Sequence, residues 1–210
     1  MGGPAVRRVR TVFSRAAVES PRGSFETVLY SARDGRVRMF QTTGFEAGLH
    51  PTGDWIVLSP EEGRRPLPAG LRQILIGHEL HMIFLDPESR FSDPVEESRT
   101  TLRDREVIPV RMADEEGRSV HLYYDVQDTL PVGMMLPTAL DTVRVGVGEW
   151  RPTGALLLFW EAEFRDGSGV YEYEYEELRL DGLPDDLFLP QGGEQDASGG
   201  KAEGPARGGM

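Results

Sequence analysis

Two histidines and a glutamate lie within four positions in the segment IGHELHMIF, residues 76–84. His78, Glu79 and His81 are the residue types of the H-E-x-x-H zinc-protease motif. In that motif, histidines at i and i+4 bind one zinc ion from one helix face, and the glutamate acts as general base. Here the histidines are three positions apart. Such a pair still shares a face on a helix, but it points to opposite faces on a strand.

A zinc site would also need a third protein ligand. The remaining histidines, His50 and His121, are far away in sequence, and the chain has no cysteine, which removes thiolate ligands, disulfides and cysteine nucleophiles. We therefore expect His78 and His81 to pack between a helix and a sheet. We predict no metal site and no cofactor.

Motifs of the common catalytic sites are also missing from the sequence. It contains no G-x-S-x-G, no P-loop and no G-x-G-x-x-G segment, and nothing brings its isolated Ser, His and Asp residues together. The alternative is an enzyme whose catalytic residues meet only in three dimensions. We predict a protein that is not an enzyme and assign no catalytic residue.

The composition limits the class of protein. The chain has 210 residues, of which 39% are hydrophobic and 28% charged, as in a soluble globular domain with a sizeable core. Its net charge of −12 disfavours nucleic acids and anionic membranes, which are bound mainly through Lys and Arg. We expect no membrane span, because no apolar run is long enough to cross a bilayer. We expect no signal peptide, because the basic start lacks an apolar h-region. We also expect a monomer.

Most of the chain has the pattern of antiparallel strands joined by tight turns. Residues 9–19, 24–32 and 37–41 are β-rich segments separated by the turns SPRG and RDGR. Strand patterns resume at residues 106–113 and 119–127 and continue through the segment VYEYEYEEL, which ends at residue 178. The sequence therefore predicts a mainly β protein.

The last hairpin has the clearest alternation of apolar and polar residues. Its first strand carries a run of apolar residues that share one face, namely Leu156, Leu158, Trp160, Ala162 and Phe164. Its second strand, VYEYEYEEL, carries tyrosines on one face (Tyr171, Tyr173, Tyr175) and glutamates on the other (Glu172, Glu174, Glu176). A period of two predicts one packed and one solvated face. We interpret the tyrosines as core, with a recognition surface as the alternative, and the glutamates as a solvated face that discourages edge pairing.

The middle of the chain has helical periodicity. The segment 67–85 is too long for one strand, and side chains recur at helical spacing at Leu71, Ile74, Leu75, His78, Met82 and Leu85. Gly77 weakens a continuous helix, because glycine costs about 1 kcal/mol relative to alanine. We predict one helix, or two short helices broken near Gly77, followed by a polar connection at 86–99. Residues 191–210 are Gly-rich and lack aromatics, so we predict one domain over 1–190 and a disordered tail.

Several segments resemble LolA-like outer-membrane lipoprotein-carrier domains. The opening GGPAVRRVRTVFSRAAVESPRGSFETVLYSARDGRVRMFQ is similar to the first strands of such domains, and GLHPTGDWIV is similar to their Gly-rich, Trp-ended segment. DVQDTLPVGMMLP and the ending YEYEYEELRLDGLPDDLFLPQ are similar to later parts, so the resemblance spans residues 2–190. One departure is that such domains usually carry a helix ahead of the Gly-Gly pair, at which this chain begins.

The resemblance implies an α+β, mainly β fold: a strongly curved antiparallel sheet, or half-barrel, with a helix or helices covering its concave face. It also implies a non-catalytic lipid or lipoprotein carrier of the periplasm or cell envelope, with an acyl chain or another apolar ligand in the concavity. Aromatic and Met side chains suit such a pocket, and the candidates are Phe40, Phe45, Trp55, Met82, Trp150, Trp160 and Tyr173. For each of them, plain core packing is the alternative. For the whole protein, the alternative is an envelope scaffold or protein-interaction domain with a filled concavity.

Overall fold

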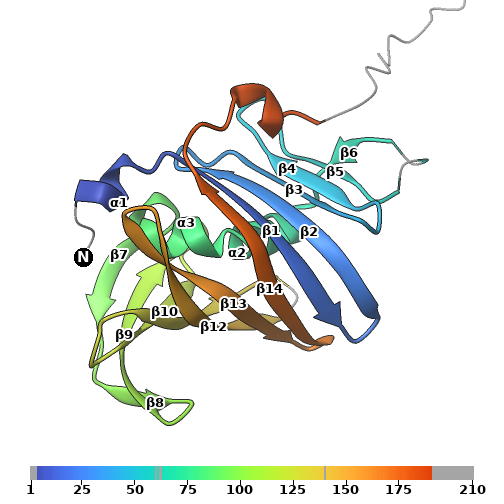
Figure 1. Cartoon of the computed structure of the whole chain (residues 1–210). Helices are drawn as coiled ribbons and strands as arrows, with labels where there is room; N and C mark the ends of the chain where they lie inside the picture. Colours follow the sequence, from blue (N-terminus) through green and yellow to red (C-terminus); the bar gives the residue numbers. More distant parts are fainter. Residues whose placement is uncertain (1–3, 60, 62, 140, 191–210) are drawn as a thin grey trace, which may run out of the picture.

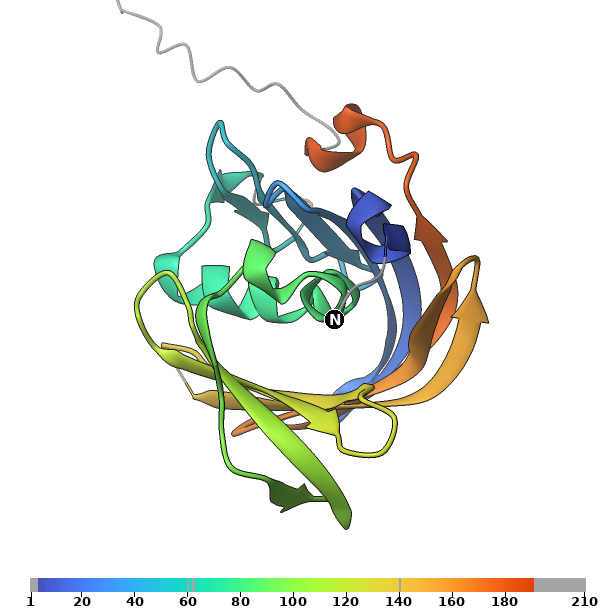
Figure 2. The same ribbon diagram turned by 90° about the vertical axis from the view of Figure 1, so that its left-hand side faces the viewer.

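The computed structural model of this protein describes residues 4–59, 61, 63–139 and 141–190. Fourteen strands form one antiparallel sheet in the order β6-β5-β4-β3-β2-β1-β14-β13-β12-β11-β10-β9-β7, with β8 paired to β9. The sheet curves strongly without closing, and helices lie on its concave side (Figures 1 and 2). The predicted half-barrel with helices on its concave face is therefore confirmed.

The first half of the sheet is a meander that follows the short helix α1 (Pro4–Arg8). Its strands are β1 (Thr11–Ser20), β2 (Gly23–Ala32), β3 (Val37–Gln41), β4 (Glu46–Leu49), β5 (Trp55–Val57) and β6 (Arg65–Pro66). Gly23 and Gly35 have φ values of +118° and +93°, so the first two turns use a conformation that suits glycine. The strands predicted at 9–19, 24–32 and 37–41 are confirmed.

The chain then crosses the concavity as two short helices, α2 (Ala69–Gly77) and α3 (Leu80–Leu85), followed by the 3₁₀ turn η1 (Pro87–Ser89). The break falls at His78 and Glu79, next to Gly77, as the sequence predicts. A Cβ on Gly77 would lie 2.7 Å from Cδ2 of Leu136 on the sheet. Glycine therefore allows the helix backbone to approach the sheet closely at this point.

The second half of the sheet is another meander, and it returns to pair with the first. Its strands are β7 (Ser92–Glu96), β8 (Thr100–Leu102), β9 (Arg105–Ala113), β10 (Ser119–Asp125), β11 (Pro131–Pro137), β12 (Thr142–Thr153), β13 (Leu156–Asp166) and β14 (Gly169–Leu180). Pairing of β14 with β1 joins the two halves. The last element, η2 (Asp185–Phe188), lies on the opposite side of the sheet from α2 and α3 (Figure 2).

The structure differs from the sequence prediction at two places. The predicted polar connection 86–99 contains strand β7, whose residues are all exposed. It was missed because an edge strand with both faces in solvent, here with a proline, carries no apolar alternation. In β13, Leu158 and Phe159 are both buried and Trp160 is not, so the predicted alternation breaks there. In the neighbouring strand, Glu149 has a φ of +48°, and it falls between the registered pairs that Gly148 and Trp150 make with β13.

Candidate functional site

The helices fill the centre of the concavity. Leu80 and Ile83 of α3 are fully buried, and they pack in the same core as Leu122 and Leu136 of the sheet. Space remains between the helical layer and the sheet at two places, one beside α3 and η1 and the other beneath α2. Two inner cavities lie there. They are named here the wide groove and the narrow cavity.

The wide groove has a volume of about 670 Å³ and lies between α3–η1 and the strands β9 to β11. Phe84 and Leu85 form the helical wall, and both are half-buried. The floor of the groove is largely apolar and is formed by Val110, Met112, Tyr124 and Pro131. The rim carries charge from Arg7, Arg33, Asp86 and Glu88. A mostly apolar floor beneath a charged rim suits an amphiphile, whose apolar part can be buried while its polar part stays in water.

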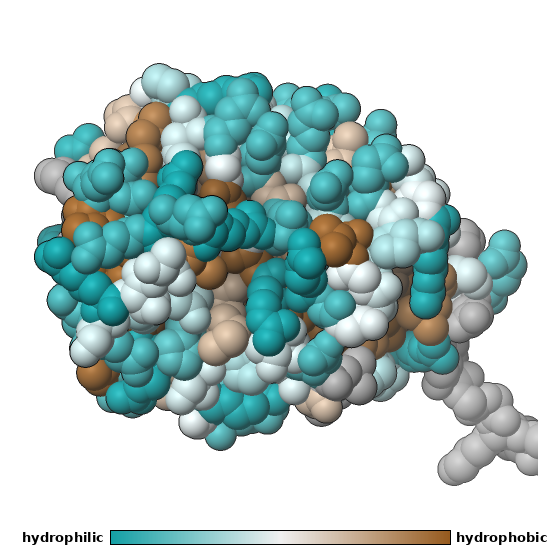
Figure 3. All heavy atoms as spheres, turned by 90° about the horizontal axis from the view of Figure 1, so that it is seen from below, coloured by the Kyte–Doolittle hydropathy of each residue, from teal (hydrophilic) through white to brown (hydrophobic). Residues whose placement is uncertain are grey.

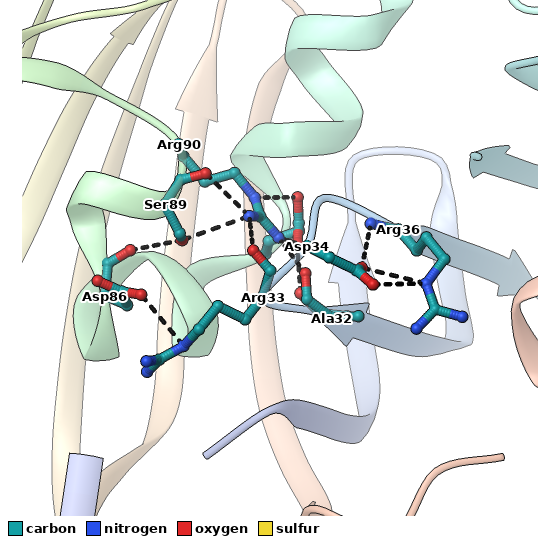
Figure 4. A network of polar contacts seen from close by, with 9 residues as sticks. Ala32, Arg33, Asp34, Arg36, Asp86, Ser89 and Arg90 are labelled. Carbon is teal, nitrogen blue, oxygen red and sulfur yellow. Dashed lines mark hydrogen bonds and ion pairs between the residues drawn. The ribbon is translucent and has the colours of Figure 1, made fainter. Parts of the chain in front are cut away.

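A buried ion pair holds the helix break against the end of β2, close to the wide groove (Figure 4). Glu79 is fully buried, and its carboxylate accepts hydrogen bonds from the Arg90 guanidinium at 3.0 and 2.5 Å and from the hydroxyl of Ser31. Arg90 also donates to the carbonyl oxygen of Ala32 at 2.7 Å. Burial raises the pKa of Glu79, whereas the hydrogen bonds and charge of Arg90 oppose that rise. Because both oxygens of this carboxylate accept hydrogen bonds from within the protein, the ion pair has a structural role.

Arg33 connects the segments that form one end of the wide groove. Its guanidinium lies 3.1 Å from the carboxylate of Asp86 and donates to the carbonyl oxygen of Val6 at 2.9 Å. The turn after β2 therefore holds both α1 and the end of α3, as Figure 4 shows for Asp86.

The narrow cavity, of about 200 Å³, lies under α2 at the other end of β2 and β11. It is lined by Phe25, Gln41, Ile74, Gly77, His78, Leu136, Val143, Phe164, Asp166, Tyr171 and Tyr173. The aromatic rings of Phe164 and Tyr173 lie with their centroids 4.7 Å apart. Most of the lining is apolar or aromatic, and Asp166 supplies the one carboxylate among these lining residues.

Both histidines of the opening motif pack on aromatic rings, as the sequence predicts. The ring of His81 stacks on Phe159 at 4.0 Å, and its Nε2 lies 3.0 Å from the Phe159 carbonyl oxygen. The ring of His78 lies 4.8 Å from that of Phe164. Burial lowers the pKa of each histidine to about 4, so both are neutral at pH 7. Within the described part of the chain, no group of three or more His, Cys, Asp or Glu residues could hold a metal ion.

The seven residues predicted to bind a ligand are not brought together. Tyr173 lines the narrow cavity, and the other six line neither inner cavity. Met82 is fully buried next to Val9 and Val12, and Phe45 is half-buried against the main core. Trp150 packs on Phe159, with their ring centroids 5.6 Å apart.

The remaining three candidates pack elsewhere. Phe40 lies beneath the guanidinium of Arg38 at 5.5 Å. Trp160 lies beneath that of Arg151 at 5.0 Å. Trp55 is buried over Gly48, where a Cβ would lie 2.6 Å from its ring. None of the residues that line the wide groove is among the seven predicted ligand-binding residues. The spacing of Val110 and Met112 within the predicted strand 106–113, which places both on one face, is the signal that could have identified part of the groove.

The predicted solvated face of the last hairpin is confirmed. Glu172, Glu174 and Glu176 are exposed, whereas Tyr173 and Tyr175 are buried. On the outer side of the sheet, a shallow groove of about 500 Å³ is lined by Glu172, Glu174 and Arg103, among others. Seen from below, hydrophilic side chains lie across strips of hydrophobic surface (Figure 3). No helix among the described residues has the length and apolar character needed to cross a membrane.

Comparison with solved structures shows the same fold in other proteins. A LolA superfamily protein from Nitrosomonas europaea matches with a TM-score of 0.64 at 12% identity, over 90% of this chain and 92% of that chain. A DUF1329 family protein from Desulfovibrio piger matches with a TM-score of 0.62 at 11% identity, over 88% and 92%. A domain assigned to outer membrane lipoprotein sorting, from Vibrio parahaemolyticus, matches with a TM-score of 0.55 at 10% identity, over 86% and 89%.

No protein-family model and no curated protein sequence matches the chain. At identities of 10–12% the structural matches establish the fold, while function must be argued from the site. This chain has the LolA-like fold, as its sequence motifs predict.

Proposed function

We propose that this protein is a non-catalytic binding or carrier protein of the bacterial cell envelope that holds the apolar part of a lipid or lipoprotein in the wide groove. The observation that carries the proposal is the groove itself. Its volume of about 670 Å³ lies within the range of roughly 300–1,000 Å³ that is typical of ligand pockets. Burying one CH₂ group contributes about 0.8 kcal/mol, so a single acyl chain along the floor would bind with useful affinity.

The ligand class and the location both rest on the fold. The Vibrio parahaemolyticus domain with this fold is described as an outer membrane lipoprotein-sorting protein domain. The charged rim fits the same ligand class, because the polar end of a lipid can meet Arg7 or Arg33 while its chain meets Phe84 and Val110. A periplasmic location would give the protein access to such ligands.

The second candidate is an envelope scaffold or protein-interaction domain with the same fold. The filled centre of the concavity favours it, because Leu80 and Ile83 occupy space that a deeply buried ligand would need. In this case the wide groove would hold no lipid.

A matched pair of variants separates the two functions. Val110→Glu places a carboxylate on the floor of the wide groove. Val95→Glu makes the same change on the exposed edge strand β7, where the valine is 43% exposed and does not line the groove. Binding of a fluorescent acyl-chain probe to the full chain is then measured by titration, together with the melting temperature of each variant.

We expect the probe to bind saturably and Val110→Glu to weaken it about tenfold, because lost contact with two CH₂ groups costs about 1.6 kcal/mol. Val95→Glu should bind like the unmodified chain. Equal affinity of the two variants would refute the groove as the site. No saturable binding, and no lipid in native mass spectra of protein purified from its own host, would favour the scaffold.

A further inference from the structure

We propose that the narrow cavity is a cage for an alkylated ammonium group, such as the quaternary ammonium of a choline-like molecule. The site shares no lining residue with the wide groove, and the proposal does not depend on what that groove holds. It rests on three properties of the cavity: aromatic walls, a single carboxylate and a small volume.

The walls present aromatic rings from three strands on one face of the sheet. Val18 of β1 pairs with Phe25 on one side and with Tyr173 on the other, so these two rings flank the same point of the sheet. Phe164 of β13 pairs with Tyr171 of β14. All four aromatic residues line the cavity. Organic cations are attracted to the faces of such rings, and aromatic cages recognise quaternary ammonium ligands in this way.

The charge of the cavity has the sign that a cation requires. Oδ1 of Asp166 accepts hydrogen bonds from the backbone N–H and the hydroxyl of Ser168 at 2.8 and 2.6 Å. Among the described residues, no hydrogen bond is formed to its Oδ2, which leaves that oxygen for a ligand. The cavity lining contains no arginine or lysine. The ring of His78 is neutral at pH 7 because burial lowers its pKa to about 4, although the charge of Asp166 acts in the opposite direction.

The same lining disfavours other ligand classes. A carboxylate or phosphate would meet Asp166 with no compensating positive charge. A compact metal ion would need several oxygen or nitrogen ligands, and the described residues provide no such group. An alkylated ammonium group is weakly hydrated and carries its charge on an apolar surface, so it can use the aromatic rings and the carboxylate together.

The volume limits how much of a ligand can enter. At about 200 Å³ the cavity is smaller than the roughly 300 Å³ at the lower end of ligand pockets. It therefore fits a head group rather than a whole lipid. The ammonium group could belong to a free small molecule or to a lipid head group at the cavity mouth, and the two sources require separate arms in the experiment.

The first test uses the unmodified full chain and two ligands of the same shape. Choline and its neutral carbon analogue, 3,3-dimethyl-1-butanol, are titrated by calorimetry. We expect choline to bind saturably and the neutral analogue to bind at least about tenfold more weakly, because only choline carries the charge that the rings and Asp166 attract. Equal affinities, or no saturable binding of choline, would overturn the proposal. This arm needs no variant and is independent of any effect on folding.

The second test compares two variants that remove one negative charge each. Asp166→Asn removes it from the cavity, and Glu172→Gln removes it from the exposed face of β14. We expect Asp166→Asn to weaken choline binding at least about fivefold and Glu172→Gln to leave it unchanged. Equal effects would mean that general charge, rather than the cage, attracts the cation, and the proposal would fail.

The third arm identifies the source of the ammonium group. Vesicles of phosphatidylcholine and of phosphatidylglycerol are incubated with the full chain and separated by flotation. Flotation with phosphatidylcholine alone, abolished by excess choline, would assign the cage to a lipid head group. Choline binding in solution without flotation would assign it to a free small molecule. Flotation with both lipids that choline does not reduce would count against the cage.

Discussion

Replacing Arg90 by methionine would leave the Glu79 carboxylate buried without its partner. Glu79 is 0% exposed and Arg90 5%, so solvent cannot take over the lost interaction. Removal of one partner of a buried ion pair typically costs about 3–5 kcal/mol, because the remaining charge is uncompensated. The carbonyl oxygens of Ala32 and Arg33 would also lose the hydrogen bonds that Arg90 donates. The Ala32 oxygen would keep the hydrogen bond from the Gly35 N–H. Since domains of this kind are stable by only about 5–15 kcal/mol, we expect a loss of about a fifth or more of the unfolding free energy.

The assay is urea unfolding followed by tryptophan fluorescence, with the free energy taken by linear extrapolation. Arg90→Met should lower the midpoint with an unchanged slope. The double variant Glu79→Gln with Arg90→Met should recover at least about 1 kcal/mol relative to Arg90→Met alone, because it leaves no buried charge. A cost below about 1 kcal/mol for Arg90→Met, or a double variant that is less stable than Arg90→Met, would refute the reasoning.

Three further outcomes are expected. The unfolding free energy should fall as the pH is lowered from 6.5 towards 4, because His81 binds a proton in the unfolded chain in this range while burial holds its pKa in the folded protein at about 4. His81→Phe should flatten this part of the pH profile, and an unchanged profile would contradict the lowered pKa of His81. Deletion of 191–210 should leave the melting temperature within error, and a drop of several degrees would show that the tail docks. Gly133→Ala should cost about 1–3 kcal/mol, because its Cβ would lie 2.4 Å from the Val145 carbonyl oxygen, whereas Gly148→Ala, with 3.9 Å of room, should cost much less; equal costs would refute this.

Much of the fold could be predicted from the sequence because it depends on local periodicity. The turns at Gly23 and Gly35 punctuate the first meander, and the helix break next to Gly77 was visible as a glycine inside a helical pattern. The alternation of tyrosine and glutamate in β14 also assigned the buried and solvated faces correctly, because a strand with one face packed imposes a period of two. Edge strand β7 escaped because neither of its faces is buried.

The site depended on how distant segments meet. A list of large apolar residues placed Phe40, Trp55 and Trp160 among the ligand candidates, but burial alone cannot distinguish a cavity wall from ordinary packing. The narrow cavity combines Phe25, His78 and Asp166, which are far apart in the chain and are brought together by the pairing of β1 with β14 and by the crossing of α2.

Local sequence patterns were sufficient to predict the apolar and solvated faces of β14, the turns of the first meander and a helical segment that interrupts the sheet, because these features follow from interactions between near neighbours. Where the helices leave space against the sheet could not be predicted in this way. That space depends on the curvature of the sheet and on the close approach of Gly77 to Leu136, and both result from packing between segments that no local pattern relates.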